Sequence, residues 1–202
     1  MTNLLRKLLL LLSLFCVSGV SLADTPVYVV EIANFSCPHC LAAESISEDI
    51  ASAAKRTGGR FVFAPLSWGD QSSWRDRVYY ASRNQGDQIS ALVRKSLFEA
   101  SQTMSLPLEN LSQVMTWLAQ DLADTEIDFE QLRRDALSES SQEAMDKALF
   151  LASQAAVNRV PTFILIQDGE VVSIFTRSQE LPSPTSLKSA VISEISRLSK
   201  SG

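Results

Sequence analysis

The chain has 202 residues, a formal net charge of −5 and three cysteines. Its length is enough for one domain of ordinary size with its own core. An acidic chain without basic runs is a poor candidate for binding nucleic acid or anionic membrane surfaces, so we expect no nucleic-acid partner.

The first 23 residues have the pattern of a secretory leader. Arg6 and Lys7 precede an apolar stretch over residues 8–20, and the small residues Ser21 and Ala23 follow it. This order predicts a signal peptide at residues 1–23 that is cleaved after Ala23. The alternative is a membrane anchor, but the apolar run is shorter than the roughly 20 residues needed to cross a bilayer. We therefore expect an exported, periplasmic protein.

The next segments predict a strand, a helix and a second strand. Residues 27–33 are β-branched and mostly apolar, which indicates a buried strand. A helical pattern covers residues 38–56, with Pro38 at the first helical position and Gly58-Gly59 at the end. Residues 60–66 form the second predicted strand. This arrangement suits a right-handed parallel crossover.

The rest of the chain first predicts helices alone and then returns to strands. The helical segments are residues 73–84, 87–100, 108–123, 128–137 and 141–157. Residues 162–166 and 171–175 are strands joined by an Asp168-Gly169 hairpin turn, and a last amphipathic helix begins at Pro184. The predicted fold class is α/β, with residues 24–66 and 138–202 forming the core domain and residues 67–137 an inserted helical domain.

Reactive side chains are concentrated in the motif Cys37-Pro38-His39-Cys40. Cys16 leaves with the leader, and His39 is the only histidine of the chain. A disulfide between Cys37 and Cys40 closes too small a loop to stabilise a fold well, because that stabilisation grows with loop length. Zinc binding would need a second Cys or His pair, which the sequence does not contain. The pair therefore predicts redox chemistry.

A C-x-x-C motif at the start of a helix provides what a reactive dithiol needs. Cys37 lies at the helix cap, where the free amide groups of the first turn favour a thiolate, and Cys40 lies one turn further in and is more buried. The helix end contributes at most about 2 kcal/mol, or roughly one pKa unit. We expect His39 to supply the rest of the lowering of the Cys37 pKa.

At these residues the sequence resembles the DsbA family of bacterial periplasmic oxidoreductases, which has the thioredoxin-like fold and the same Cys-Pro-His-Cys motif. Val160-Pro161 stands directly before the late strand, where the family has a cis proline facing the active site. If the bond is cis, the Val160 backbone can face Cys37 and pair with an extended client peptide. The helical insertion between the two halves of the core is also a family trait.

The resemblance extends to three charged residues. Glu31 and Glu44 resemble acidic family positions near the buried cysteine, and Arg60 stands where the family can carry a lysine. We expect Glu31 to move the Cys40 proton, with Glu44 and Arg60 close to it. Arg159 departs from the family, which often has a glycine before the Val-Pro pair, and this departure predicts an altered substrate groove.

The resemblance implies a protein disulfide oxidoreductase whose Cys37–Cys40 disulfide passes to folding secreted proteins that carry thiols. A membrane reoxidase of the DsbB type would restore the disulfide, and neither a metal nor a further cofactor is expected. We expect a monomer. Two alternatives remain open: a reductase or isomerase on the same fold, and a thiol-based metal-binding or chaperone module without turnover.

Overall fold

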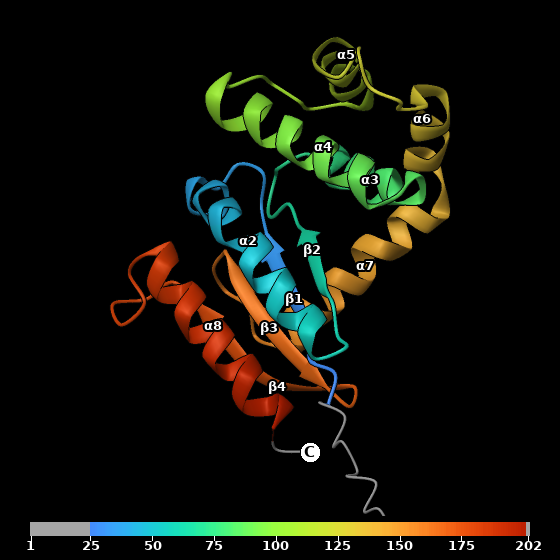
Figure 1. Cartoon of the computed structure of the whole chain (residues 1–202). Coiled ribbons are helices and arrows are strands. Elements are labelled where there is room, and N and C mark those ends of the chain that lie inside the picture. The colour runs from blue at the N-terminus through green and yellow to red at the C-terminus, as the bar shows by residue number, and fades with distance from the viewer. Residues whose placement is uncertain (1–24, 201–202) are drawn as a thin grey trace, which may run out of the picture.

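A computed structural model describes residues 25–200 and contains a four-stranded mixed sheet with the order β2-β1-β3-β4 (Figure 1). The strands are β1 (Tyr28–Ala33), β2 (Phe61–Pro65), β3 (Thr162–Gln167) and β4 (Glu170–Thr176). β1 and β2 are parallel, whereas β3 pairs antiparallel with both β1 and β4. The predicted leader lies outside the described residues.

The parallel pair is joined by helix α2 (Pro38–Arg56), which confirms the predicted crossover. Helix α8 (Pro184–Ser199) packs beside α2 on the same face of the sheet (Figure 1). Lys188 of α8 forms a 2.7 Å ion pair with Asp49 of α2. The hairpin turn between β3 and β4 is also confirmed, because Asp168 and Gly169 both have the positive φ of a type I′ turn (52° and 83°).

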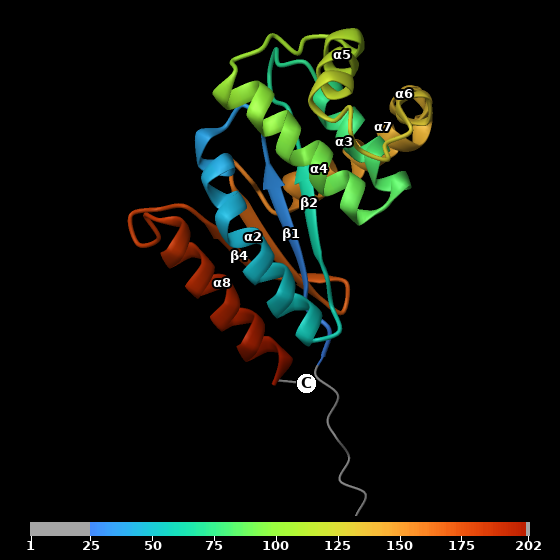
Figure 2. The same ribbon diagram turned by 45° about the horizontal axis from the view of Figure 1, so that its top comes forward.

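The helical block lies between β2 and β3 in the sequence. Its helices are α3 (Trp74–Ser82), α4 (Asp87–Phe98), α5 (Leu111–Asp121), α6 (Phe129–Leu137) and α7 (Glu139–Gln154), with a short 3₁₀ turn η2 (Arg83–Gln85) and a π turn η3 (Glu99–Thr103). Helices α3 to α6 stand beyond the carboxyl ends of β1 and β2 (Figure 2). The block therefore faces the end of the sheet at which α2 begins.

Helix α7 connects the block to the sheet, because it contacts both α3 and β2. Among the described residues, no helix is long and apolar enough to cross a membrane.

Two apolar cores lie on the two sides of the sheet. One packs Val29, Phe163 and Leu165 against α2 and α8. The other extends from Ile32 and Ile164 on the opposite face into the helical block without a break. The predicted inserted domain thus shares its core with the sheet.

Four aromatic rings mark the junction between the sheet and the helical block. Phe35 follows β1, Phe63 lies in β2, Tyr79 in α3 and Phe98 in α4. Their ring centroids are 5.0–6.3 Å apart in tilted or edge-to-face arrangements. Such pairs are stabilising beyond their area burial. We call these four residues the aromatic cluster, and it holds the segment before Cys37 against the block.

Gly59 is required where the chain returns from α2 to β2. A Cβ atom at this position would lie 2.0 Å from the backbone oxygen of Val27.

We expect Gly59→Ala to lower the free energy of unfolding by about 3 kcal/mol, because backbone atoms must shift to remove the clash. Gly69→Ala is the control: no atom lies within 4 Å of the added Cβ, and only its positive φ opposes the substitution. Its cost is about 1 kcal/mol. Chemical denaturation measures both, and equal losses would contradict the steric argument.

Candidate active site

Cys37 occupies the N-cap position of α2, at the end of the loop that leaves β1. Its backbone is extended (φ −96°, ψ 114°), and Pro38 begins the helix. Cys37 is partly exposed, whereas Cys40, one turn further along, is fully buried. Both are free thiols in this structure. The predicted difference in burial between the two sulfurs is present.

The two cysteines have opposite pKa shifts. The pKa of Cys37 is lowered to about 6, first by a hydrogen bond from the Cys40 thiol and then by the backbone N–H groups of Cys40 and His39, against the opposing effect of burial. The pKa of Cys40 is raised far above the usual thiol range, because it donates this hydrogen bond and is buried. At neutral pH the pair therefore holds one thiolate, on the accessible sulfur.

His39 contributes less to this thiolate than the sequence analysis predicted. The charge of His39 is the smallest of the named effects that lower the Cys37 pKa, and its backbone N–H also contributes. His39 thus contributes to the lowering as expected, but the Cys40 thiol, which the sequence analysis did not consider, contributes most. The exposed imidazole is engaged elsewhere: Nη1 of Arg177 contacts its Nδ1 and lies 2.9 Å from its Nε2.

The Val160-Pro161 segment lies beside the reactive sulfur. The peptide bond is cis, as in the family that the sequence resembles, and the Cys37 sulfur lies 3.6 Å from the Val160 carbonyl oxygen, to which it can donate a hydrogen bond when it is protonated. Pro161 immediately precedes β3. Val160 and the motif are far apart in the sequence, and the pairing of β3 with β1 brings them together in space.

Glu31 is fully buried in the middle of β1, on the face that packs against α2. Its Oε2 accepts a 3.2 Å hydrogen bond from Ser47 of α2, and Oε1 has no hydrogen-bond partner among the described atoms. Burial, followed by the nearby Glu44 carboxylate, raises the Glu31 pKa to about 8. The charge of Glu31 in turn raises the pKa of Cys40. Glu31 is therefore protonated at neutral pH and electrostatically coupled to the buried thiol.

Glu44 has a cationic partner that the sequence analysis did not identify. Nε of Arg94 lies 2.9 Å from Oε2 of Glu44, and the Arg94 guanidinium stands 4.9 Å from the centre of the Phe63 ring. Burial raises the Glu44 pKa, and Arg94 opposes this effect. Arg94 also lowers the pKa of Glu31. Arg94 of α4 thus lowers the pKa of both carboxyl groups beside the cysteine pair.

The loop that carries Cys37 is held by polar contacts from the helical block. Arg75, which is 7% exposed, places Nη1 2.7 Å from the Ser36 hydroxyl. Gln102 donates a 2.7 Å hydrogen bond to the Phe35 carbonyl. Asn34 accepts a hydrogen bond from the Ser36 backbone N–H and donates one to the Leu66 carbonyl. These contacts, together with the aromatic cluster, fix the position of the residue before the nucleophile.

The family model described as Thioredoxin matches residues 22–188. The chain belongs to the thioredoxin family.

Solved structures of similar fold carry the name DsbA. NmDsbA1 of Neisseria meningitidis matches at a TM-score of 0.68 and 18% identity, covering 86% of this chain and 84% of that one. DsbA of Xylella fastidiosa matches at 0.65 and 20%, covering 88% of both chains. DsbA of Pseudomonas aeruginosa matches at 0.66 and 23%, covering 87% of both. These likenesses establish the fold, and no curated protein matches the sequence.

Within this thioredoxin-family site, Arg60 does not occupy the place that the resemblance implied. Its side chain is exposed and makes no ion pair among the described residues, whereas Arg94 pairs with Glu44. The Arg60 expectation is therefore corrected to Arg94. A signal for Arg94 was present in the sequence, because it follows Val93 on the apolar stripe of a predicted helix, where a charged residue needs a partner.

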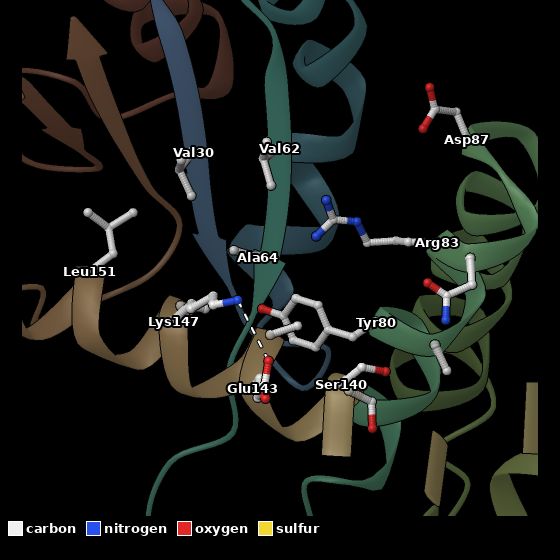
Figure 3. A pocket seen from close by; sticks show the side chains of 15 residues that line it. Val30, Val62, Ala64, Tyr80, Arg83, Asp87, Ser140, Glu143, Lys147 and Leu151 are labelled. Atoms are coloured by element: carbon white, nitrogen blue, oxygen red, sulfur yellow. Dashed lines mark ion pairs between the residues drawn. The ribbon is translucent and has the colours of Figure 1, made fainter. Parts of the chain in front are cut away.

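A cavity lies on the face of the sheet opposite to the one that carries Glu31. It measures about 600 Å³ and lies between the sheet, the end of α3 and α7 (Figure 3). Val30, Val62 and Leu151 line its apolar side, and an ion pair between Lys147 and Glu143 lies at its edge. Because side chains alternate along a strand, Val30 and Glu31 face opposite sides of the sheet. This cavity is thus separate from the cysteine pair.

Within residues 25–200, no cluster of His, Cys, Asp and Glu could hold a metal ion.

The ranking of effects on Cys37 can be tested by titration. We expect Cys40→Ala to raise the Cys37 pKa from about 6 by about one unit or more, because the main hydrogen bond to the thiolate is lost. His39→Ser should raise it by less. Thiolate absorbance at 240 nm as a function of pH measures both, with Cys37→Ser as the blank. A larger shift in His39→Ser would restore His39 as the main cause.

The buried Glu31 predicts a pH-dependent stability. Its folded pKa of about 8 exceeds the unfolded value of 4.5, so the unfolded state releases its proton first as pH rises. The contribution of Glu31 to stability is thus greatest below pH 4.5 and falls until pH 8. We expect Glu31→Gln to be more stable than the wild type by about 4 kcal/mol at pH 8 and by little at pH 4.5. Denaturation across this pH range measures the difference in free energy of unfolding between the variant and the wild type. If this difference does not change with pH, Glu31 does not titrate in this range.

Proposed function

We propose that this protein is a periplasmic thiol:disulfide oxidoreductase that donates its Cys37–Cys40 disulfide to folding secreted proteins. The observation that carries the proposal is the contrast between an accessible sulfur with a pKa of about 6 and a buried sulfur whose pKa is strongly raised. The predicted leader and the absence of other cysteines from residues 24–202 support an exported redox protein.

The reaction begins with the oxidised protein. A client thiolate attacks the Cys37 sulfur, which forms a mixed disulfide and releases Cys40 as a thiolate. Because Cys40 has a strongly raised pKa, this thiolate takes up a proton. Glu31, protonated at neutral pH and coupled to Cys40, is the group that we propose to supply it, with Glu44 and Arg94 setting its charge.

A second client thiolate then attacks the client sulfur of the mixed disulfide. The client leaves with a disulfide, and Cys37 leaves as a thiolate. Its low pKa makes it a good leaving group, because a more stable thiolate departs faster. Two electrons have passed from the client to the Cys37–Cys40 pair. A membrane reoxidase of the DsbB type would accept these electrons and restore the disulfide, and no other cofactor is needed.

The Val160 segment gives the client a place to bind. Its backbone lies beside the reacting sulfur and immediately precedes β3, so an extended client peptide can pair with it as an added strand. Pro38 contributes no backbone donor at the start of α2. We propose that the protein acts as a monomer on unfolded, thiol-bearing clients, with no role for nucleic acid.

A strong oxidant must be more stable when reduced. Only the reduced form holds the Cys37 thiolate, and its folded pKa of about 6 lies below the unfolded value of 9.0. This stabilisation is complete above pH 9 and is lost as the pH falls through 6. We expect the stability difference between reduced and oxidised protein to move by about 2 kcal/mol in favour of the reduced form from pH 5 to pH 9, a value discounted because the sulfur is partly exposed.

Denaturation of both redox forms across this pH range tests the expectation. Reduced Cys37→Ser is the control, because it lacks the thiolate and should show no such gain in stability as the pH rises. If the oxidised wild type is the more stable form at pH 8, the protein is not a strong oxidant and the reductase alternative replaces this proposal.

A further inference from the structure

A shallow groove of about 630 Å³ lies beside the motif. Its lining combines His39, the loop residues Arg159 and Val160, and Arg177 with the segment that follows β4. Val160 links the groove to the reaction, because its carbonyl oxygen lies 3.6 Å from the Cys37 sulfur. A peptide that crosses this groove therefore passes the sulfur that it would attack.

The groove is cationic in an acidic protein. Arg159 and Arg177 are both exposed, and none of the described residues that line the groove carries a carboxylate. The chain as a whole has a net charge of −5. The carboxylate of Glu180, on the same loop as Arg177, accepts a hydrogen bond from Ser178 and lies outside the lining. No residue of the groove lining thus carries a negative charge that could neutralise Arg159 and Arg177.

Arg177 is held in position from two sides. Its Nε donates a 2.7 Å hydrogen bond to the Pro182 carbonyl, and its Nη1 contacts the His39 ring. The loop itself is closed by a hydrogen bond from the Ser178 backbone N–H to the Leu181 carbonyl. A guanidinium that is already ordered loses less conformational entropy when it binds an anion, and its planar fork matches a carboxylate.

We propose that this groove is a subsite for acidic client segments, in which Arg159 and Arg177 bind aspartate or glutamate side chains close to the client cysteine. An extended peptide advances about 3.3 Å per residue, so carboxylates within a few residues of the cysteine can reach the groove while the sulfur meets Cys37. Lysine and arginine at the same client positions are repelled. The inference rests on the proposed function, whose client class it narrows.

Binding without redox chemistry tests the groove by itself. The probe is a fluorescent, amidated hexapeptide with serine in place of cysteine and aspartate on both sides, compared with the same peptide carrying asparagine. We expect the aspartate peptide to bind the full protein about tenfold more tightly at low salt, since two exposed ion pairs contribute modestly each. High salt should reduce the difference, because it screens exposed charges.

The matched variants keep the net charge equal. Arg159→Gln/Arg177→Gln should abolish the preference for the aspartate peptide. Arg56→Gln/Arg133→Gln removes two exposed arginines from the far end of α2 and from α6, and should preserve most of it. Equal dissociation constants for the two peptides in the wild type, or the same loss in both double variants, would overturn the proposal.

Oxidation rates distinguish this inference from the proposed function. Cysteine peptides flanked by aspartate or by lysine are mixed with oxidised protein, and the ratio of their second-order rate constants is compared between the wild type and Arg159→Gln/Arg177→Gln. Changes in Cys37 reactivity affect both peptides alike, so the ratio reports the groove. We expect it to fall about tenfold in the variant. An unchanged ratio overturns the groove alone, whereas a wild type that oxidises neither peptide overturns the proposed function and leaves the binding experiment to decide the groove.

Discussion

The position of the reactive sulfur depends on the burial of Phe35. This side chain is 1% exposed and packs against Phe63, Tyr79 and Phe98, which holds the chain between β1 and α2 against the helical block. Cys37 comes two residues later, at the start of the helix. Two of these rings belong to α3 and α4, which means that the helical block is part of what positions Cys37. A change in the packing of the block would therefore reach the site through the aromatic cluster.

The same helix turn places two identical side chains in different surroundings. Cys37 is partly exposed and accepts hydrogen bonds, whereas Cys40 lies in the shared core, where ionisation is opposed by burial and by the neighbouring thiolate. A buried carboxyl group, Glu31, is coupled to the second sulfur. The difference between the two thiols thus arises first from the hydrogen bond that the Cys40 thiol donates to Cys37, and then from the deeper burial of Cys40.

Two arginines act at this site in opposite environments. Arg94 lies partly buried against Phe63 and pairs with Glu44, and its charge lowers the pKa of both Glu31 and Glu44 against the effect of burial. Arg177 lies at the surface, ordered by Pro182 and His39, where its charge is directed toward whatever enters the groove. The first lowers the pKa of the carboxyl groups near Cys40, and the second contributes positive charge to the groove beside Cys37.

Much of the fold and the centre of the site could be predicted from the sequence, because they rest on local patterns. Hydrophobic period, Pro38 and Gly58-Gly59 define α2, Asp168-Gly169 defines the hairpin, and the spacing of Cys37 and Cys40 places both at one helix end. The resemblance carried by Val160-Pro161 correctly indicated a cis bond beside the motif. Each of these features depends on residues that are neighbours in the chain or on a specific motif.

The tertiary structure decided which residues far apart in the sequence are in contact. Arg94 rather than Arg60 pairs with Glu44, because the packing of α4 over β2 brings its side chain to the carboxylates. The Cys40 thiol rather than the charge of His39 provides the largest lowering of the Cys37 pKa, and Arg177 contacts the imidazole from the segment after β4. Spacing along the chain determines which groups share a helix turn. Only the packing of helices against the sheet determines which distant charge comes within hydrogen-bond distance, and electrostatic effects depend on that distance and on burial.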